Sequence, residues 1–168
     1  GPAGAPAWSP CGKWVAYYGN EKGDISSLNT EVMFAAADGS GQIRSVSGGW
    51  DRNVPGGLGS DARMDNGGGG PAWSADGKHV YFATADGGKS YVFRIGVQDG
   101  KVESLTAPVP CANSYDLQPA ACAGGPMIAF HGADFLMIGE IYVVCPESGK
   151  PPVRLTSFND ELLGQLEL

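Results

Sequence analysis

The chain has 168 residues, 27 of them glycine, and a formal net charge of −7, which is enough length for one ordinary domain. The acidic balance argues against nucleic acid and against a membrane surface as partners, because both attract clustered Lys and Arg. No apolar run approaches the roughly 18 residues that cross a bilayer. Most of the glycines lie at predicted turns, so an all-β domain is expected.

A first four-stranded unit is predicted within residues 1–54. It opens with Pro6-Ala7-Trp8-Ser9, and further strands are expected at residues 14–17, 32–34 and 43–47. Val, Tyr and Phe in these stretches suit a pleated, half-buried surface. Asp38-Gly39 suits a tight turn, because both residue types tolerate positive φ. The pattern predicts one small antiparallel sheet.

Residues 55–70 have the sequence PGGLGSDARMDNGGGG and separate the first unit from the second. A polar, glycine-rich composition resists a single conformation, so this stretch is predicted to be a flexible insertion between two units. A mobile surface loop is the main interpretation, and a loop that gates substrate entry is the alternative.

A second unit, residues 71–112, repeats the first at an offset of 65, since Pro71-Ala72-Trp73-Ser74 matches the opening Pro-Ala-Trp-Ser. Asp-Gly pairs separate its expected strands, which cover residues 72–74, 79–84, 91–96 and 102–106. The hydrophobic pattern matches Val32-Met33-Phe34 with Tyr91-Val92-Phe93. The two units are therefore predicted to share one strand arrangement.

A third and degenerate copy occupies residues 113–156, with strands expected at residues 118–121, 127–130, 141–144 and 153–156. Repeats of about 45 residues, each with four short strands, are typical of β-propeller blades. Closed propellers use about four to eight blades, so about three four-stranded antiparallel blades, part of a larger propeller, are expected. Open blade edges invite pairing, so an oligomer formed through them is a further expectation.

The motif PAWSPCGKWVAY, followed by an Asp-Gly turn and a closing Leu-Thr, resembles the WD-like propeller repeat of the Tol-system propeller protein and of the prolyl oligopeptidase family. Residues 154–163, RLTSFNDELL, resemble the segment that leaves the propeller of acylaminoacyl-peptidase-like members. Residues 157–168 are thereby expected to be an exit segment toward an α/β-hydrolase domain. The sequence departs from the family pattern at Cys11, where Asp is usual, and in the third copy, which lacks Trp-Ser.

The resemblance implies a non-catalytic propeller segment of a serine peptidase, which gates the access of short peptides to a hydrolase domain outside this chain. The triad Ser, Asp and His would then lie beyond Leu168, and the hydrolase domain would be the main partner. An alternative of another class is a stand-alone Tol-like or WD-like propeller that binds proteins. A third alternative is a fragment that folds only when paired with copies of itself.

The chain itself carries no recognisable catalytic set. An α/β-hydrolase presents its nucleophile in G-x-S-x-G, and the nearest string, Gly57-Leu58-Gly59-Ser60-Asp61, ends in Asp. His79 precedes the second strand of its unit, and His131 closes the equivalent strand of the third unit. No catalytic, cofactor-binding or metal-binding residue is expected. The candidates for facing a central channel are His131, Glu21 and Asp24.

Four cysteines are present, and no two of them form a C-x-x-C pair, so a zinc ribbon is not expected. They are Cys11, Cys111, Cys122 and Cys145. Cys145 ends an apolar strand, where a buried structural thiol is the common case. Free structural thiols are predicted, with at least one disulfide as the alternative. Free thiols suit a reducing cytoplasm, which is the expected location.

Overall fold

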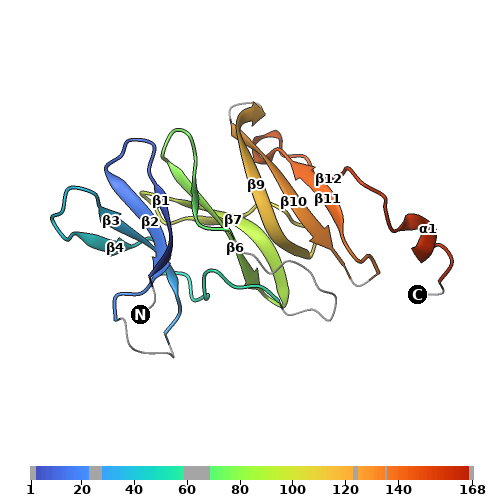
Figure 1. The fold of residues 1–168 in the computed structure, drawn as a ribbon, viewed down its shortest axis with the longest axis horizontal. Helices are drawn as coiled ribbons and strands as arrows, with labels where there is room; N and C mark the ends of the chain where they lie inside the picture. Colours follow the sequence, from blue (N-terminus) through green and yellow to red (C-terminus); the bar gives the residue numbers. More distant parts are fainter. Residues whose placement is uncertain (1–2, 23–27, 59–68, 123–124, 135, 167–168) are drawn as a thin grey trace.

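The computed structural model describes residues 3–22, 28–58, 69–122, 125–134 and 136–166. These residues are almost entirely β-structure, arranged as three blades that stand side by side (Figure 1), which confirms the predicted fold class. The first blade is an antiparallel sheet in the order β1-β2-β3-β4. Its strands are β1 (Gly4–Trp8), β2 (Trp14–Gly19), β3 (Glu31–Ala36) and β4 (Ile43–Ser45).

The second blade contains β5 (Ala72–Trp73), β6 (His79–Asp86), β7 (Lys89–Gly96) and β8 (Val102–Ser104). Asp86 pairs with Lys89, so Gly87 and Gly88 alone connect β6 to β7. The φ angles of these glycines are 58° and 76°. Positive φ at both positions is the requirement of a type I′ two-residue loop, which explains why the break in the sequence is Asp-Gly-Gly.

The third blade contains β9 (Cys111–Cys122), β10 (Gly125–Ala133), β11 (Glu140–Val144) and β12 (Val153–Arg154). Its first strand starts at Cys111, earlier than the Gln118 expected from the repeat. A parallel pairing of Ser90 with Cys111 joins β9 to β7. A 3₁₀ turn η1 (Pro146–Ser148) follows β11, and α1 (Asp160–Leu163) lies in the tail beyond β12.

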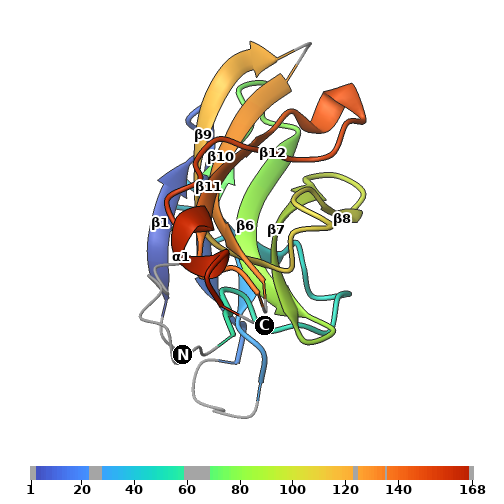
Figure 2. The ribbon, with the colours of Figure 1, turned by 90° about the vertical axis from the view of Figure 1, so that its right-hand side faces the viewer.

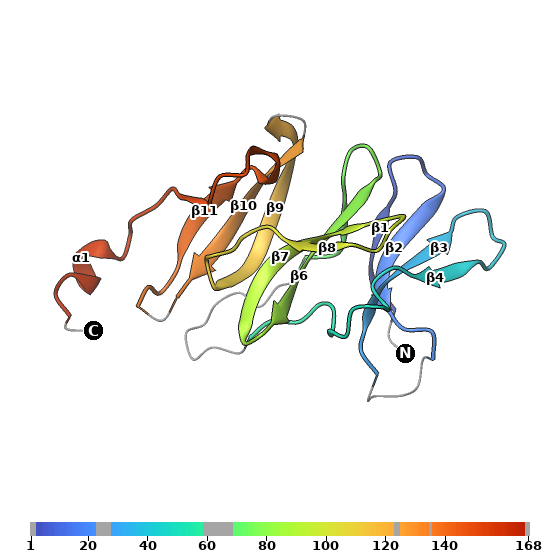
Figure 3. The same ribbon diagram turned by 180° about the vertical axis from the view of Figure 1, so that it is seen from behind.

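Two apolar cores lie between the blades. The core between the first and second blades includes Tyr18, Phe34, Val80, Phe82 and Ile95. The core between the second and third blades includes Tyr81, Val92, Ile128, Phe130 and Tyr142. Neighbours such as Tyr81 and Phe82 serve different cores because successive side chains of a strand point to opposite faces. Figure 3 shows from behind how the second blade lies between the other two.

A hydroxyl contact that recurs within each blade identifies equivalent residues in the three blades. Ser47, Thr106 and Thr156 close the three blades, and each side-chain oxygen accepts the backbone N–H of Val32, Val92 or Ile141, respectively, at 2.9, 3.1 and 2.9 Å. Val32 is therefore equivalent to Val92, and Phe34 is equivalent to Arg94. The sequence-based match of Phe34 with Phe93 was wrong by one residue, which in a strand means the opposite face.

The tail leaves the third blade beside its outer strands. Figure 2, which looks onto the third blade, shows α1 in front of the sheets. Within the described part of the chain, no helix has the length and apolar character needed to cross a bilayer.

Candidate functional site

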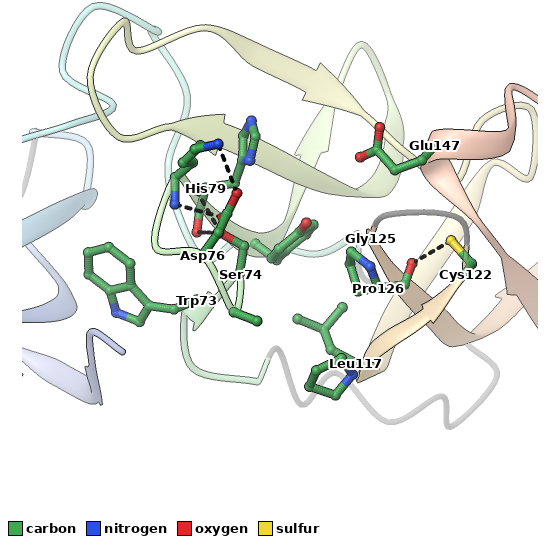
Figure 4. Close-up of a pocket in the computed structure, with 13 residues that line it drawn as sticks. Trp73, Ser74, Asp76, His79, Leu117, Cys122, Gly125, Pro126 and Glu147 are labelled. Carbon is green, nitrogen blue, oxygen red and sulfur yellow. Dashed lines mark hydrogen bonds and ion pairs between the residues drawn. The ribbon is translucent and has the colours of Figure 1, made fainter. Parts of the chain in front are cut away.

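A cleft of about 430 Å³ lies between the second and third blades and is here called the blade cleft. Figure 4 shows Trp73 and the β5–β6 turn on one side, with Leu117, Pro126 and Glu147 on the other. Its wall combines aromatic and aliphatic surface with charged groups at the rim. Such a mixture is typical of binding sites.

The turn between β5 and β6 places Ser74, Asp76 and His79 beside one another at the blade cleft. The Ser74 hydroxyl donates to Asp76 Oδ1 at 2.7 Å and accepts the backbone N–H of His79 at 2.9 Å. Asp76 Oδ1 also accepts the Lys78 N–H at 3.0 Å. The Lys78 amide and the Ser74 hydroxyl lower the pKa of Asp76.

This arrangement is a turn motif and contains no nucleophile–base pair, because Ser74 meets His79 only through the main chain. The first blade repeats the contact, since Trp14 N–H donates to the Ser9 hydroxyl at 3.0 Å. Nucleophilic activation would need an imidazole nitrogen within hydrogen-bond reach of the hydroxyl. The Ser-Asp-His cluster is thus explained by the need to satisfy a tight turn.

Arg94 links the two walls of the blade cleft. Its Nε lies 2.7 Å from Glu103 on β8, and its Nη1 forms an ion pair with Glu147 of the third blade. Lys101 and Arg94 together lower the pKa of Glu103 to about 2. The charges at this rim are therefore largely paired with one another.

Trp73 packs toward the first blade. Its ring centroid lies 4.7 Å from that of Phe34, and its Nε1–H donates to the Ala7 carbonyl at 3.1 Å. Trp73 thus contributes to the packing between the first and second blades. Trp8, its equivalent in the first blade, is 67% exposed.

A disulfide joins Cys122 at the end of β9 to Cys145 after β11. The expectation of four free thiols was therefore wrong, and Cys145 is not a free buried thiol. The error has a geometric cause: β10 folds back along β9, and β11 follows β10, so residues 23 apart in sequence meet at one end of the sheet. Cys11 and Cys111 are free.

The structure describes two of the three candidates for a channel, and they lie on different blades. His131 lies on β10 of the third blade, at the register position of Tyr18 and Ala83. Its imidazole packs on Gly139, where an added Cβ would lie 2.3 Å from Nε2. Glu21 lies in the turn after β2 of the first blade, beside a separate surface cavity. Asp24 lies outside the described residues.

Sequence reasoning missed a buried carboxylate, Glu140, which is 1% exposed. It accepts hydrogen bonds from the Thr156 hydroxyl and from Asn159 N–H, the latter at 3.0 Å, and pairs with Arg154 at 3.2 Å. Burial opposes ionisation, but these partners prevail and lower the pKa of Glu140 to about 2. The sequence feature that could have indicated this buried carboxylate is the stretch Ser-Phe-Asn-Asp, which directly follows Thr156 at the end of the third blade.

The Glu140 network fixes the start of the tail. Asn159 also donates through Nδ2 to the Gly139 carbonyl at 3.0 Å, and Arg154 pairs with Asp160 of α1. Apolar side chains beyond this anchor are exposed, at 84% for Phe158. No group of three or more His, Cys, Asp or Glu side chains within the described ranges could hold a metal ion.

No protein-family model and no curated protein matches the sequence. Among solved structures, TolB from Acinetobacter baumannii superposes with a TM-score of 0.58 at 17% identity, over 94% of this chain and 33% of its own. Acylaminoacyl peptidase from Pyrococcus horikoshii gives 0.60 at 14% identity, over 93% of this chain and 20% of its own. Puromycin hydrolase gives 0.54 at 19% identity, over 90% and 21%.

The chain spans a third or less of each of these three proteins. At such identities the likeness concerns the fold, and it agrees with the repeated blades, the interblade cores and the closing hydroxyl contacts. The chain is a β-propeller segment of three antiparallel blades, with the fold found in TolB, acylaminoacyl peptidase and puromycin hydrolase.

Proposed function

We propose that these blades belong to the propeller of a serine peptidase and control the access of short peptides to a hydrolase domain outside this chain. The observation that carries the proposal is the match of 93% of this chain to only 20% of acylaminoacyl peptidase, a hydrolase by name. Function is inferred here by analogy with the fold and with the sequence motifs.

The physical role follows from the stiffness of the blades. Each interblade core combines aliphatic and aromatic side chains, and strand side chains on both faces of the second blade are fully buried. A stiff array of this kind admits extended peptides and excludes folded proteins by size, while it shields a reacting centre from bulk water. The chemistry would be supplied by a Ser, His and Asp outside the chain.

The tail supports contact with a further domain. The Glu140 network holds the chain as it leaves the third blade, and the apolar residues beyond it are solvent-exposed: Phe158, Leu162 and Leu166. Burying such side chains against another domain is favourable by roughly 25 cal/mol per Å² of apolar surface. The hydrolase domain is the partner that this surface would meet.

The disulfide changes the expected location. Disulfides persist in oxidising compartments and are rare in the cytoplasm. The cytoplasmic expectation rested on free thiols, so the Cys122–Cys145 bridge favours a secreted or periplasmic setting instead.

A paired assay tests the proposal. The pure 168-residue chain should hydrolyse no short peptide above the buffer rate, because its only Ser–His contact at the blade cleft runs through the main chain. The native polypeptide that carries this sequence should cleave short peptides. It should leave intact a folded protein that contains the same peptide sequences. Turnover by the pure chain, or equal cleavage of the folded protein, would contradict it.

A protein-binding propeller is the second candidate, because TolB matches with a TM-score of 0.58, close to that of the peptidase. In that case the blade cleft would hold a segment of a partner protein. A native preparation that shows no peptidase activity yet retains a bound protein partner would favour this candidate.

A further inference from the structure

An aromatic cluster fills the junction between the first and second blades. Phe34 packs on Trp73, with 4.7 Å between ring centroids, and on Trp14, with 6.4 Å. The Trp73 indole is also oriented by a hydrogen bond from Nε1–H to the Ala7 carbonyl at 3.1 Å. The guanidinium of Arg44 covers the Phe34 ring at 5.0 Å from its centroid. The rings of two blades thus interlock at this level of the sheets.

The equivalent positions on the second blade carry polar side chains. His79 occupies the position of Trp14, because the two residues pair with Gly96 and Ala36, respectively. Arg94 occupies the position of Phe34 and forms ion pairs with Glu103 and Glu147 instead of packing on a ring. The second blade therefore offers the third blade no copy of the Trp14–Phe34 pair.

On the third blade, Leu117 takes the place of Trp73. Trp73 pairs with Val80, and Leu117 pairs with Ile128. These two partners are equivalent, since the closing hydroxyl contacts align the second and third blades. A leucine side chain is shorter than an indole and cannot reach as far toward the neighbouring blade.

The blade cleft follows from these replacements. Leu117 and His79, which stand where the first junction has two indoles, both line it. Figure 4 shows them on opposite sides of the cleft, with Pro126 beside Leu117. Its volume of about 430 Å³ falls in the range of ligand pockets, roughly 300 to 1,000 Å³. The space that rings fill in the first junction is open to solvent in the second.

The charges around the blade cleft are matched within the chain. Arg94 is shared by Glu103 and Glu147, and Lys78 Nζ lies 3.4 Å from Asp76 Oδ2. An ionic ligand would have to break these pairs, and an uncharged ring would not. The apolar wall made by Leu117 and its neighbours favours the ring as well.

We propose that the blade cleft binds an aromatic side chain of a peptide segment, in the space that the Trp73 indole fills at the first junction. The ring would lie between Leu117 and His79. A peptide is favoured over a free aromatic molecule because the occupant of the equivalent space is itself a side chain on an extended strand, β5. The inference rests on the comparison of two blade junctions, so it stands with either proposed function.

The blade cleft lies at the end of the third blade away from the tail. Pro126, near the start of β10, lines the cleft, whereas Glu140 pairs with Gly132 near the other end of that strand. The two ends of β10 are well separated in Figure 1. A partner that contacts the tail therefore need not cover the cleft.

Calorimetric titration of the pure chain tests the proposal, with a capped Gly-Trp-Gly peptide as the probe. Capped Gly-Ala-Gly and free indole are the comparisons. The tryptophan peptide should bind at least about tenfold more tightly than the alanine peptide, because its ring buries additional apolar surface. It should also bind more tightly than indole. Equal affinity for both peptides would overturn the site, and equal affinity for indole would overturn the assignment to a peptide.

Leu117→Trp supplies an indole to the cleft from the chain itself. It should weaken binding of the tryptophan peptide at least about tenfold, since the ring can no longer bury the same surface. His79→Trp fills the space from the opposite wall and should have the same effect. Leu162→Trp, the matched control on the exposed tail, should bind like the wild type.

Circular dichroism and urea unfolding show whether each variant keeps its fold. Wild-type affinity in both folded cleft variants would contradict the proposal, as would an equal loss in Leu162→Trp. The measurement records binding without turnover. Its failure is therefore distinct from a failure of the peptidase proposal, which concerns hydrolysis by the native polypeptide.

Discussion

The disulfide provides the most quantitative prediction. Replacing both Cys122 and Cys145 with Ser removes a bridge that closes a loop with a sequence separation of 23. In the chain-entropy relation, a loop of this length restricts the unfolded chain by about 11 cal/mol/K, or about 3 kcal/mol at 25 °C. Because small domains have total stabilities of roughly 5 to 15 kcal/mol, this loss is a large fraction of the whole.

Urea unfolding at one fixed protein concentration measures the effect, since association would otherwise shift the midpoint. The double variant should lose about 3 kcal/mol. Cys11→Ser, which alters an exposed free thiol, is the control and should unfold like the wild type. The reasoning is refuted if the double variant is as stable as the wild type, or if intact mass after alkylation shows four free thiols in the native chain.

Three further changes test other contacts. Thr106→Val leaves the buried Val92 N–H without its acceptor and should cost about 1 to 3 kcal/mol in urea unfolding, whereas exposed Ser104→Ala should cost little. Phe34→Ala empties the core between the first two blades and should lower the free energy of unfolding by about 3 to 5 kcal/mol; a smaller loss than that of Ser104→Ala would contradict the packing. The pKa of Glu140 is lowered from 4.5 to about 2, so its ionised contacts stabilise the fold above pH 4.5, and this stabilisation is lost as pH falls toward 2. Unfolding curves across that range should show a weaker acid loss for Glu140→Gln; an unchanged acid loss would show that the network does not form.

The strands of the second blade were predictable because local chemistry specifies them. Gly87 and Gly88 supply the two positive φ angles of the hairpin, and β-branched and aromatic residues fill the strands on either side. The equivalent hairpin of the first blade has a long connection in place of two glycines. Hydrophobic matching across that connection allowed a one-residue error in the alignment of the two blades, which the Ser47 and Thr106 contacts and the strand pairings reveal.

The remaining features depend on contacts between residues far apart in sequence. Cys122 meets Cys145 only after β10 and β11 have paired, and sequence alone allows three pairings of four cysteines. In the sequence Glu140 looks like an ordinary surface carboxylate, because its hydrogen-bond donors Thr156 and Asn159 reach it only in the folded chain. His131 could be assigned to a strand end from the repeat, but the face it occupies required the pairing with Ile141.

Fluorophosphonate labelling of the native preparation, read by intact mass, tests most directly whether the catalytic serine lies outside these blades. Our account predicts label on a polypeptide that contains or binds this sequence, and none on the isolated 168 residues. Label on these residues themselves, or no label on any polypeptide in the preparation, would contradict it.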